Sequence, residues 1–273
     1  MGIFLIIRAG ATFLVALLIL GPTIALAQDT LETLRAMNLR AAKLASPSLF
    51  GIPSAGTMGH RHSFVAGSAA TQSRTDTGDL KLDASAALGL GLGNAVKTVG
   101  LDAYLGIISV NPEGKNGGFG VGEDGNVSLK LGKAFYTNEL DRFSIAIGGN
   151  NLIAWGDAEE IDENIFAVGS YATAVMINDH AYGVSISLGA GTKQKSSTSF
   201  GAFAGLGFKA HPSVDFALGF NANRWVAGIT VPLGELIDVE IGDGIYLQVG
   251  VDDVLDDQEN RRGVMNVSIP FQI

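Results

Sequence analysis

The sequence predicts an all-β protein: a closed antiparallel transmembrane β-barrel of about twelve strands, preceded by a short N-terminal helix. Three observations support this prediction. From Asp79 to Gly93, apolar residues alternate without a break with polar or very small ones, which is the period of an extended strand with two different faces. The chain has 37 Gly and only 16% charged residues, against about 25% in ordinary globular domains. Turn signals separate further alternating segments as far as Ile273.

The stretch 79–93 indicates which face is which. Its even positions carry Leu or Ala, whereas its odd positions run from Asp79, Lys81 and Asp83 to Gly. The stretch is long enough to cross a bilayer, which takes roughly 9–11 tilted residues. A water-soluble sandwich would place Lys, Glu and Thr on its outer face, but here the second face thins to Gly and Ala. We therefore expect the Leu face to contact lipid and the other face to line a crowded interior.

Residues 1–27 predict a secretory signal peptide. Arg8 lies near the start, an apolar run follows from Ala9 to Leu20, and the small-residue site Ala25-Leu26-Ala27 ends the segment. An uncleaved membrane anchor is the alternative, because the apolar stretch is nearly long enough to span a bilayer.

Residues 28–59 predict an N-terminal helix and a linker. Apolar residues recur at helical spacing between Asp29 and Ala45, and Pro47 ends the pattern. The helix has two possible places, against the periplasmic rim of the barrel or inside its lumen as a plug.

The barrel is predicted to span residues 60–273. The candidate strands are 60–72, 78–93, 97–110, 125–136, 142–155, 163–176, 181–193, 198–210, 212–221, 223–233, 243–252 and 262–273. An even number suits a single-chain barrel with both termini on the periplasmic side. The run from Gly148 to Asn151 fits either a bulge within one strand or a hairpin turn between two. Both faces of 60–72 and of 163–176 are mixed.

The end of the chain continues the alternation: Met265, Val267, Ile269, Phe271 and Ile273 alternate with Asn266, Ser268 and Pro270. Over residues 60–273 this pattern resembles the bacterial outer-membrane β-barrel proteins. The resemblance implies a place in the cell outer membrane, with outer-membrane lipid and the barrel assembly machinery as partners. Family members usually end on an aromatic residue, whereas here the aromatic Phe271 stands two places early.

Composition excludes several classes of site. The chain has no Cys, so disulfides, thiolate metal sites and lipoprotein attachment are excluded. Without residues 1–27, 17 Lys and Arg stand against 27 Asp and Glu, a net charge of −10. Such an acidic chain has no basic footprint for nucleic acid, and no cofactor is predicted.

Catalytic and metal-binding motifs are weak. His60, His62 and Ser63 lie close together, but no spacing supplies a third metal ligand or a third member of a catalytic triad. The acidic runs 157–163 and 252–259 miss the spacing of calcium loops and are interpreted as solvated loops. The glycine-rich run 117–122 lacks the Lys-Ser/Thr of a nucleotide-binding loop. We therefore expect no enzyme.

The function predicted from the sequence is a porin-like channel for passive passage of small solutes or ions. The alternative is a structural or surface-interaction barrel with a closed interior and no transport, because fold alone does not decide between the two. Candidate lumen-lining residues are Lys81, Asp83, Asp102, Lys130, Asp215, Arg224, Gln248, Asn266 and Ser268.

Overall fold

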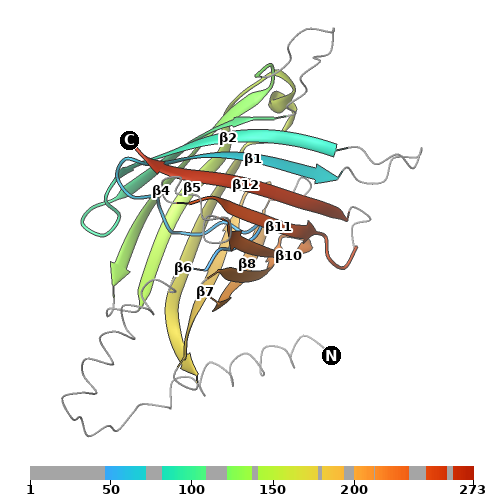
Figure 1. Ribbon diagram of the computed structural model, residues 1–273. Helices are drawn as coiled ribbons and strands as arrows, with labels where there is room; N and C mark the ends of the chain where they lie inside the picture. The colour runs from blue at the N-terminus through green and yellow to red at the C-terminus, as the bar shows by residue number, and fades with distance from the viewer. Residues whose placement is uncertain are drawn as a thin grey trace, which may run out of the picture. The chain divides into compact units, whose positions relative to one another are not determined.

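The protein forms a closed barrel in a computed structural model (Figure 1). The structure describes residues 47–71, 82–108, 122–136, 141–177, 180–193, 200–211, 213–233, 244–256 and 261–273. The predicted signal peptide, the predicted helix 29–45 and Lys81 lie outside the described residues. The chain divides into two compact units, 1–37 and 38–273, and the barrel belongs to the second. Among the described residues, no helix combines the length and hydropathy needed to cross a membrane.

Twelve strands build the barrel within the described residues, which confirms the predicted fold class. They are β1 His62–Thr71, β2 Leu82–Gly93, β3 Gly100–Ile107, β4 Gly125–Tyr136, β5 Arg142–Trp155, β6 Asn164–Ile177, β7 His180–Gly191, β8 Gly201–His211, β9 Val214–Asn221, β10 Arg224–Pro232, β11 Tyr246–Asp252 and β12 Arg262–Gln272. Each predicted strand corresponds to one of them. A short 3-10 helix, Gly156–Glu160, follows β5.

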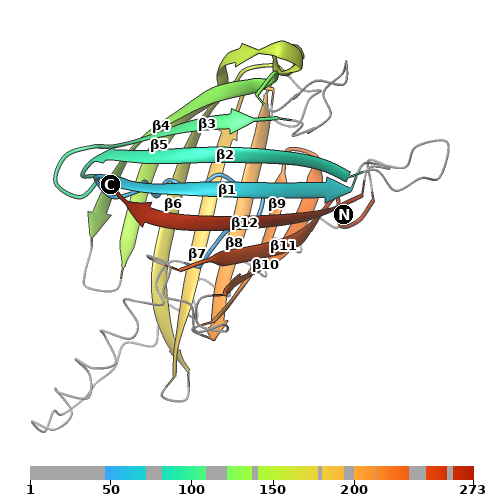
Figure 2. The same ribbon diagram turned by 45° about the horizontal axis from the view of Figure 1, so that its top comes forward.

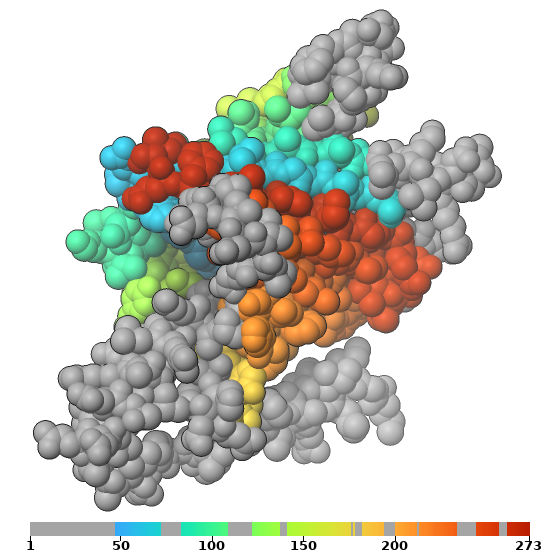
Figure 3. All heavy atoms as spheres, in the orientation of Figure 1, coloured from blue at the N-terminus to red at the C-terminus, as the bar shows by residue number. Residues whose placement is uncertain are grey.

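The barrel closes where the first strand meets the last. Every strand pairs antiparallel with its neighbour in sequence, and β1 pairs with β12 from His62 opposite Gln272 to Ala70 opposite Val264. Figures 1 and 2 show β1 between β2 and β12, and Figure 3 shows the atoms of these strands as one continuous wall. Within the described residues, closure gives each of the twelve strands a paired neighbour on both sides. We call the end where β1 begins and β12 finishes the terminal end of the barrel.

The outer and inner faces follow the predicted alternation. In β7, the even residues Ile186 and Leu188 face outward while the odd residues Ser185, Ser187 and Gly189 face inward, and the same parity holds in β2, β8 and β9. In β11 the parity is reversed, with Val249 outward and Gln248 inward. Many outward side chains are large, apolar and exposed, for example Ile147 at 60% and Leu188 at 62% exposure. This is the surface of a barrel that has lipid rather than water around it.

The glycine-rich run in β5 is a bulge within one strand. The alternative, a hairpin turn between two short strands, is not what the structure shows. The pairing with β4 shifts register after Val127, so that residues 150–152 stand opposite Ser128 alone. Asn151 takes a positive φ of 58°, a conformation that Asn tolerates better than most residues. Its amide nitrogen donates to the carbonyls of Ala158 and Ile161, and this fixes the 3-10 turn above the bulge.

Candidate functional site

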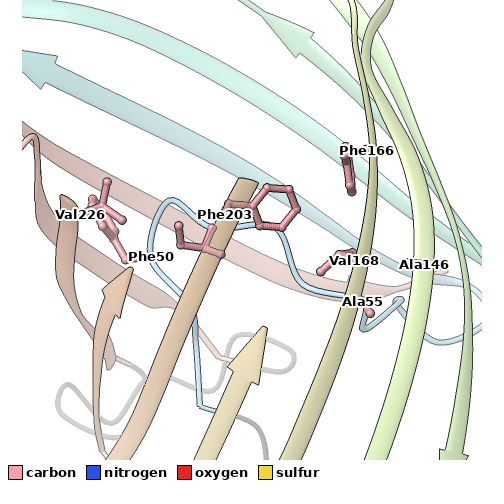
Figure 4. Close-up of a cluster of buried hydrophobic side chains, with 8 residues drawn as sticks. Phe50, Ala55, Ala146, Phe166, Val168, Phe203 and Val226 are labelled. Carbon is pink, nitrogen blue, oxygen red and sulfur yellow. The ribbon is translucent and has the colours of Figure 1, made fainter. Parts of the chain in front are cut away.

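A stretch of extended chain occupies the barrel interior. Residues 47–59, which we call the lumen segment, precede β1 and run between strands on different sides of the barrel (Figure 4). Phe50 lies beside Val226 of β10, and Ala55 lies beside Val168 of β6. The predicted helix 29–45, a possible plug, lies outside the described residues, and the described chain in the lumen belongs to the predicted linker.

The backbone of the lumen segment is bonded to inward side chains of five strands, and a sixth strand, β11, contacts the Ser48 side chain. Near its start, Ser48 N donates to Asp215 Oδ2 at 2.9 Å, and the Pro47 carbonyl accepts from Ser185 Oγ at 3.1 Å. Further contacts are Asn221 Nδ2 to the Gly51 carbonyl (3.1 Å), Ala55 N to Ser170 Oγ (2.8 Å) and Gln248 Nε2 to Ser48 Oγ (2.9 Å). An extended chain away from water must pair its peptide groups, and the barrel wall supplies these partners.

The strongest anchor is an ion pair on β3 and β4. Lys130 Nζ lies 3.2 Å from Asp102 Oδ2, and the two side chains are only 12% and 1% exposed. Asp102 Oδ1 accepts from Met58 N at 2.9 Å, while Lys130 donates to the carbonyls of Ser54 and Gly56 at 3.3 and 2.5 Å. Tyr104 completes the carboxylate shell through its hydroxyl, 2.9 Å from Oδ2. We call this arrangement the clamp, because one ion pair holds three backbone groups of the lumen segment.

Pairs of inward glycines receive the side chains of the lumen segment. Phe50 lies on Gly228 and Gly250, which face each other across β10 and β11; a methyl group on either would come within 2.5 Å of its ring. Ile52 lies in the same way on Gly205 and Gly219 of β8 and β9. Thr57 lies on a third cross-strand pair, Gly100 and Gly132. Glycine at these positions lets another part of the chain approach the wall closely.

Apolar residues of the lumen segment and of the barrel wall form one buried cluster inside the barrel. Its buried members are Phe50, Ile52, Ala55, Ala146, Phe166, Val168, Phe203 and Val226. Phe166 and Val168 are inward residues of β6, which explains the mixed faces of the predicted strand 163–176. Their inner face is apolar because it packs within this cluster rather than against water.

The lumen is filled unevenly. Most contacts of the lumen segment are made with β3–β9, which we call the filled side. Beside β1, β2 and β10–β12, the cavity side, a cavity of about 430 Å³ remains. Its lining residues are Phe50, Gly51, Phe64, Ala66, Ser68, Ser85, Ala86, Ala87, Val226, Gln248, Asp252, Val264 and Asn266. The inward Phe64 of β1 belongs to this lining, which accounts for the mixed faces of the predicted strand 60–72.

The predicted lumen residues that are described lie on the inner face and, apart from Ser268, fall into three sets. Asp102 and Lys130 form the clamp. Three other charged residues have ion partners: Asp215 with Lys209 (2.5 Å), Arg224 with Asp252 (3.5 Å) and Asp83 with Arg262 (3.5 Å). Gln248 and Asn266 line the cavity. Ser268 stands opposite Ala66 and Tyr246 on the same face. The structure does not bring all these residues together at one point.

The acidic run at 252–259 differs from its prediction as a solvated loop. Asp252 and Asp253 are buried, with Asp253 fully so. Asp252 is buried because Arg224 of the neighbouring strand supplies a counter-charge. By contrast, Asp162 of the other acidic run is exposed and pairs with Lys193 at 2.5 Å.

No metal or hydrolase arrangement is assembled from the histidines that the structure describes. The His60 ring accepts from Gly93 N, and the His62 ring lies 3.3 Å from the His60 carbonyl. Ser63 is buried on the outer face between Leu90 and Phe271. Across the described ranges, no group of three or more His, Asp or Glu could hold a metal ion.

Sequence reasoning named Asp102, Lys130, Asp215 and Gln248 on the wall but missed the lumen segment itself and several of its neighbours. Phe50 and Ile52 lie in a stretch without strand or helix periodicity. Lys209, however, shares inward parity with Gly205 and Gly207 along one strand, so the alternation alone could have identified it. Ser170 and Ser187, whose hydroxyls lie 2.6 Å apart, could have been found in the same way.

The closed wall, the apolar exterior and the polar and glycine-lined interior define a transmembrane β-barrel of the even-stranded, single-chain kind. The sequence matches no protein-family model and no curated protein. Among solved structures, the chain is similar to an outer membrane channel from Pseudomonas putida F1, with 13% identity, a TM-score of 0.47, and coverage of 81% of this chain and 99% of the other. It is also similar to the KdgM porin in complex with disordered oligogalacturonate, with 6% identity, a TM-score of 0.46, and coverage of 77% and 99%. The outer membrane protein Omp33 of Acinetobacter baumannii shows 7% identity, a TM-score of 0.42, and coverage of 78% and 98%. At these identities and TM-scores the likeness identifies no function for this chain.

Proposed function

We propose that this protein is an outer-membrane channel for small solutes or ions, and that the lumen segment sets the width of its bore. The observation that carries the proposal is the unfilled cavity of about 430 Å³ between the lumen segment and the cavity side. The inner wall is built largely from Gly, Ala and Ser, so its own side chains do not fill a twelve-stranded barrel. Solutes pass along the cavity side, next to the lumen segment, which makes most of its contacts with the filled side.

The exterior supports the membrane location. Exposed apolar side chains occur on the outward face of strands all around the barrel, for example Leu88 on β2, Leu206 on β8 and Val249 on β11. A surface of this kind is stable in lipid and aggregates in water. The partners in this proposal are outer-membrane lipid and the machinery that assembles barrels, for which the alternating last strand and Phe271 are the candidate signal.

A closed structural barrel is the second candidate, and the anchoring of the lumen segment favours it. The clamp, the glycine pairs and the hydrogen bonds hold this segment at both of its ends and in the middle. A structural barrel that does not conduct would need the same anchoring to keep its interior packed. Conductance measurement separates the two functions.

Single-channel recording in planar bilayers tests the proposal with three proteins: the wild type, a loosened variant and a locked variant. The loosened variant is Phe50→Gly with Ile52→Gly. The locked variant is Ile52→Cys with Gly205→Cys, because a Cβ at Gly205 would lie 3.2 Å from the Ile52 Cβ, close to the roughly 3.5–4.5 Å of disulfides. The chain has no native Cys, so the introduced pair is the sole disulfide. The two single-Cys proteins are the controls.

We expect the wild type and the oxidised locked variant to show small single-channel conductance steps. The loosened variant should show conductance steps at least about twice as large. Equal steps from the locked and loosened proteins would show that the lumen segment does not set the bore. Absence of steps from all three, in protein shown by heat-modifiable gel migration to be folded, would overturn the channel and leave the closed barrel.

A further inference from the structure

The cavity side carries a row of uncharged polar groups. Ser85 of β2 stands opposite Ser68 of β1, Ser68 stands opposite Asn266 of β12, and Asn266 stands opposite Gln248 of β11. Directly opposed residues of antiparallel strands are immediate neighbours on one face. Four consecutive strands therefore present hydroxyl and amide groups at one level of the cavity.

This row combines donors with acceptors. The Ser68 and Ser85 hydroxyls lie 2.6 Å apart, and Gln248 Nε2 donates to Ser48 Oγ and to Thr230 Oγ1 at 2.9 and 3.2 Å. A hydroxyl has two lone pairs and an amide has four hydrogen-bonding positions. These contacts therefore leave capacity for further hydrogen bonds into the cavity.

The same cavity has apolar walls and offers no counter-charge. Phe50, Phe64, Val226 and Val264 supply its apolar lining. Among the described lining residues, Asp252 alone carries a formal charge, and Arg224 lies 3.5 Å from it. An ion that left water for this cavity would lose hydration without meeting an opposite charge, which is costly. A neutral solute with several hydroxyl groups has no such penalty.

We propose that the cavity is a binding and transit site for neutral, polyhydroxylated solutes of the size of a monosaccharide. Its volume of about 430 Å³ lies in the range of small-molecule sites, roughly 300–1,000 Å³. The solute's hydroxyls bond to Ser68, Ser85, Gln248 and Asn266, and its C–H faces lie on Phe50 and Phe64. This assignment rests on the proposed channel, because it names the solute class that passes along the cavity side.

The test uses the full mature chain in liposomes and in planar bilayers, with glucose as the neutral probe and with gluconate and glucosammonium as charged probes of matched size. We expect glucose to enter liposomes at least about five times faster than either ion. We also expect glucose to block potassium chloride conductance in a saturable way, since a solute in the cavity obstructs the ion path.

Two variants locate the site. Asn266→Leu replaces the central amide of the row, whereas Ala69→Leu adds the same side chain to the outward face of β1, opposite Met265 and Ala84. We expect Asn266→Leu to weaken glucose block about tenfold and to slow glucose entry, since a lost amide leaves ligand hydroxyls unpaired. Ala69→Leu should show the same glucose block and the same rate of glucose entry as the wild type.

Other outcomes separate this inference from the channel itself. Equal entry of glucose and the charged probes, or unchanged glucose block in Asn266→Leu, would overturn the neutral-solute site while leaving the channel intact. If the folded wild type shows neither conductance in planar bilayers nor glucose entry into liposomes, then the proposed channel and the proposed site are both wrong.

Discussion

Two serine pairs on opposite sides of the lumen show how the filled side and the cavity side differ. Ser170 and Ser187 face inward from β6 and β7, and Ser68 and Ser85 face inward from β1 and β2. In both pairs the hydroxyls lie 2.6 Å apart and the residues are 17 positions apart in sequence. The first pair also accepts the Ala55 N–H at 2.8 Å, whereas the second lines the cavity.

The difference shows that one inward pattern has two uses. Beneath the lumen segment, a serine satisfies a buried peptide group and thereby holds structure in place. Beside the cavity, the same side chain meets the space that we assign to solutes. We therefore expect matched substitutions on the two sides to separate stability from transport.

The largest effect on stability is expected from breaking the clamp. Lys130→Ala leaves the Asp102 carboxylate buried without its counter-ion, and removal of one partner of such a pair costs about 3–5 kcal/mol. The measurement is the temperature at which heat-modifiable gel migration is lost. A variant that unfolds at the wild-type temperature would show that the clamp is not a structural anchor of the filled side.

The next effect comes from enlarging inward residues. Gly219→Ala places a methyl group against the Ile52 side chain and near the Ala204 carbonyl, and such overpacking costs about 1–3 kcal/mol. Ala66→Val on the cavity side adds bulk toward open space, so its unfolding temperature should stay near that of the wild type. Equal losses in the two variants would contradict the uneven filling of the lumen.

The serine pairs give a contrast of similar or smaller size that separates stability from transport. Ser170→Ala removes the acceptor of the Ala55 N–H, and an unsatisfied buried donor costs about 1–3 kcal/mol. Ser85→Ala should change stability by less than about 0.5 kcal/mol while reducing glucose block. Denaturant unfolding in detergent measures the first effect and bilayer recording the second.

The smallest effect is expected at the pair of Asp83 and Arg262. Asp83 is 44% exposed and the charged groups lie 3.5 Å apart, so Asp83→Asn should cost less than about 1 kcal/mol. The loss should shrink further in high salt, because ions screen exposed charges. A loss as large as that of Lys130→Ala would mean that exposure does not distinguish the two ion pairs.

Much of the wall could be predicted from the sequence because inward and outward residues alternate with a fixed period. That period located all twelve strands, and it placed residues such as Leu206 and Leu218 outward and Asp215 and Gln248 inward. Strand ends differ by a few residues, since turn signals mark a loop without fixing its first bonded residue.

The contents of the lumen could not be predicted in the same way. The lumen segment is extended but pairs with side chains rather than with another strand, so its own residues show no period. The residues adapted to it are instead on the wall. They are inward glycines such as Gly228 and Gly250 and apolar inward residues such as Phe166 and Val168. From sequence alone, these positions fit a wide lumen and a filled one equally well.

The path of the lumen segment also has a topological consequence. Its first residues contact Asp215 and Ser185, near the terminal end of β9 and β7, and its last residues lie at Gly91, near the same end of β2. The segment therefore folds into the barrel and returns to the end where it entered, without threading through to the other side. It can be withdrawn as a loop while all twelve strands stay paired. Its contacts join residues as far apart as Ser48 and Gln248, and the pair that closes the wall joins His62 and Gln272; contacts of such long sequence separation slow folding. Because its release breaks no strand pair, we expect this loop to leave the lumen before the wall of the barrel opens.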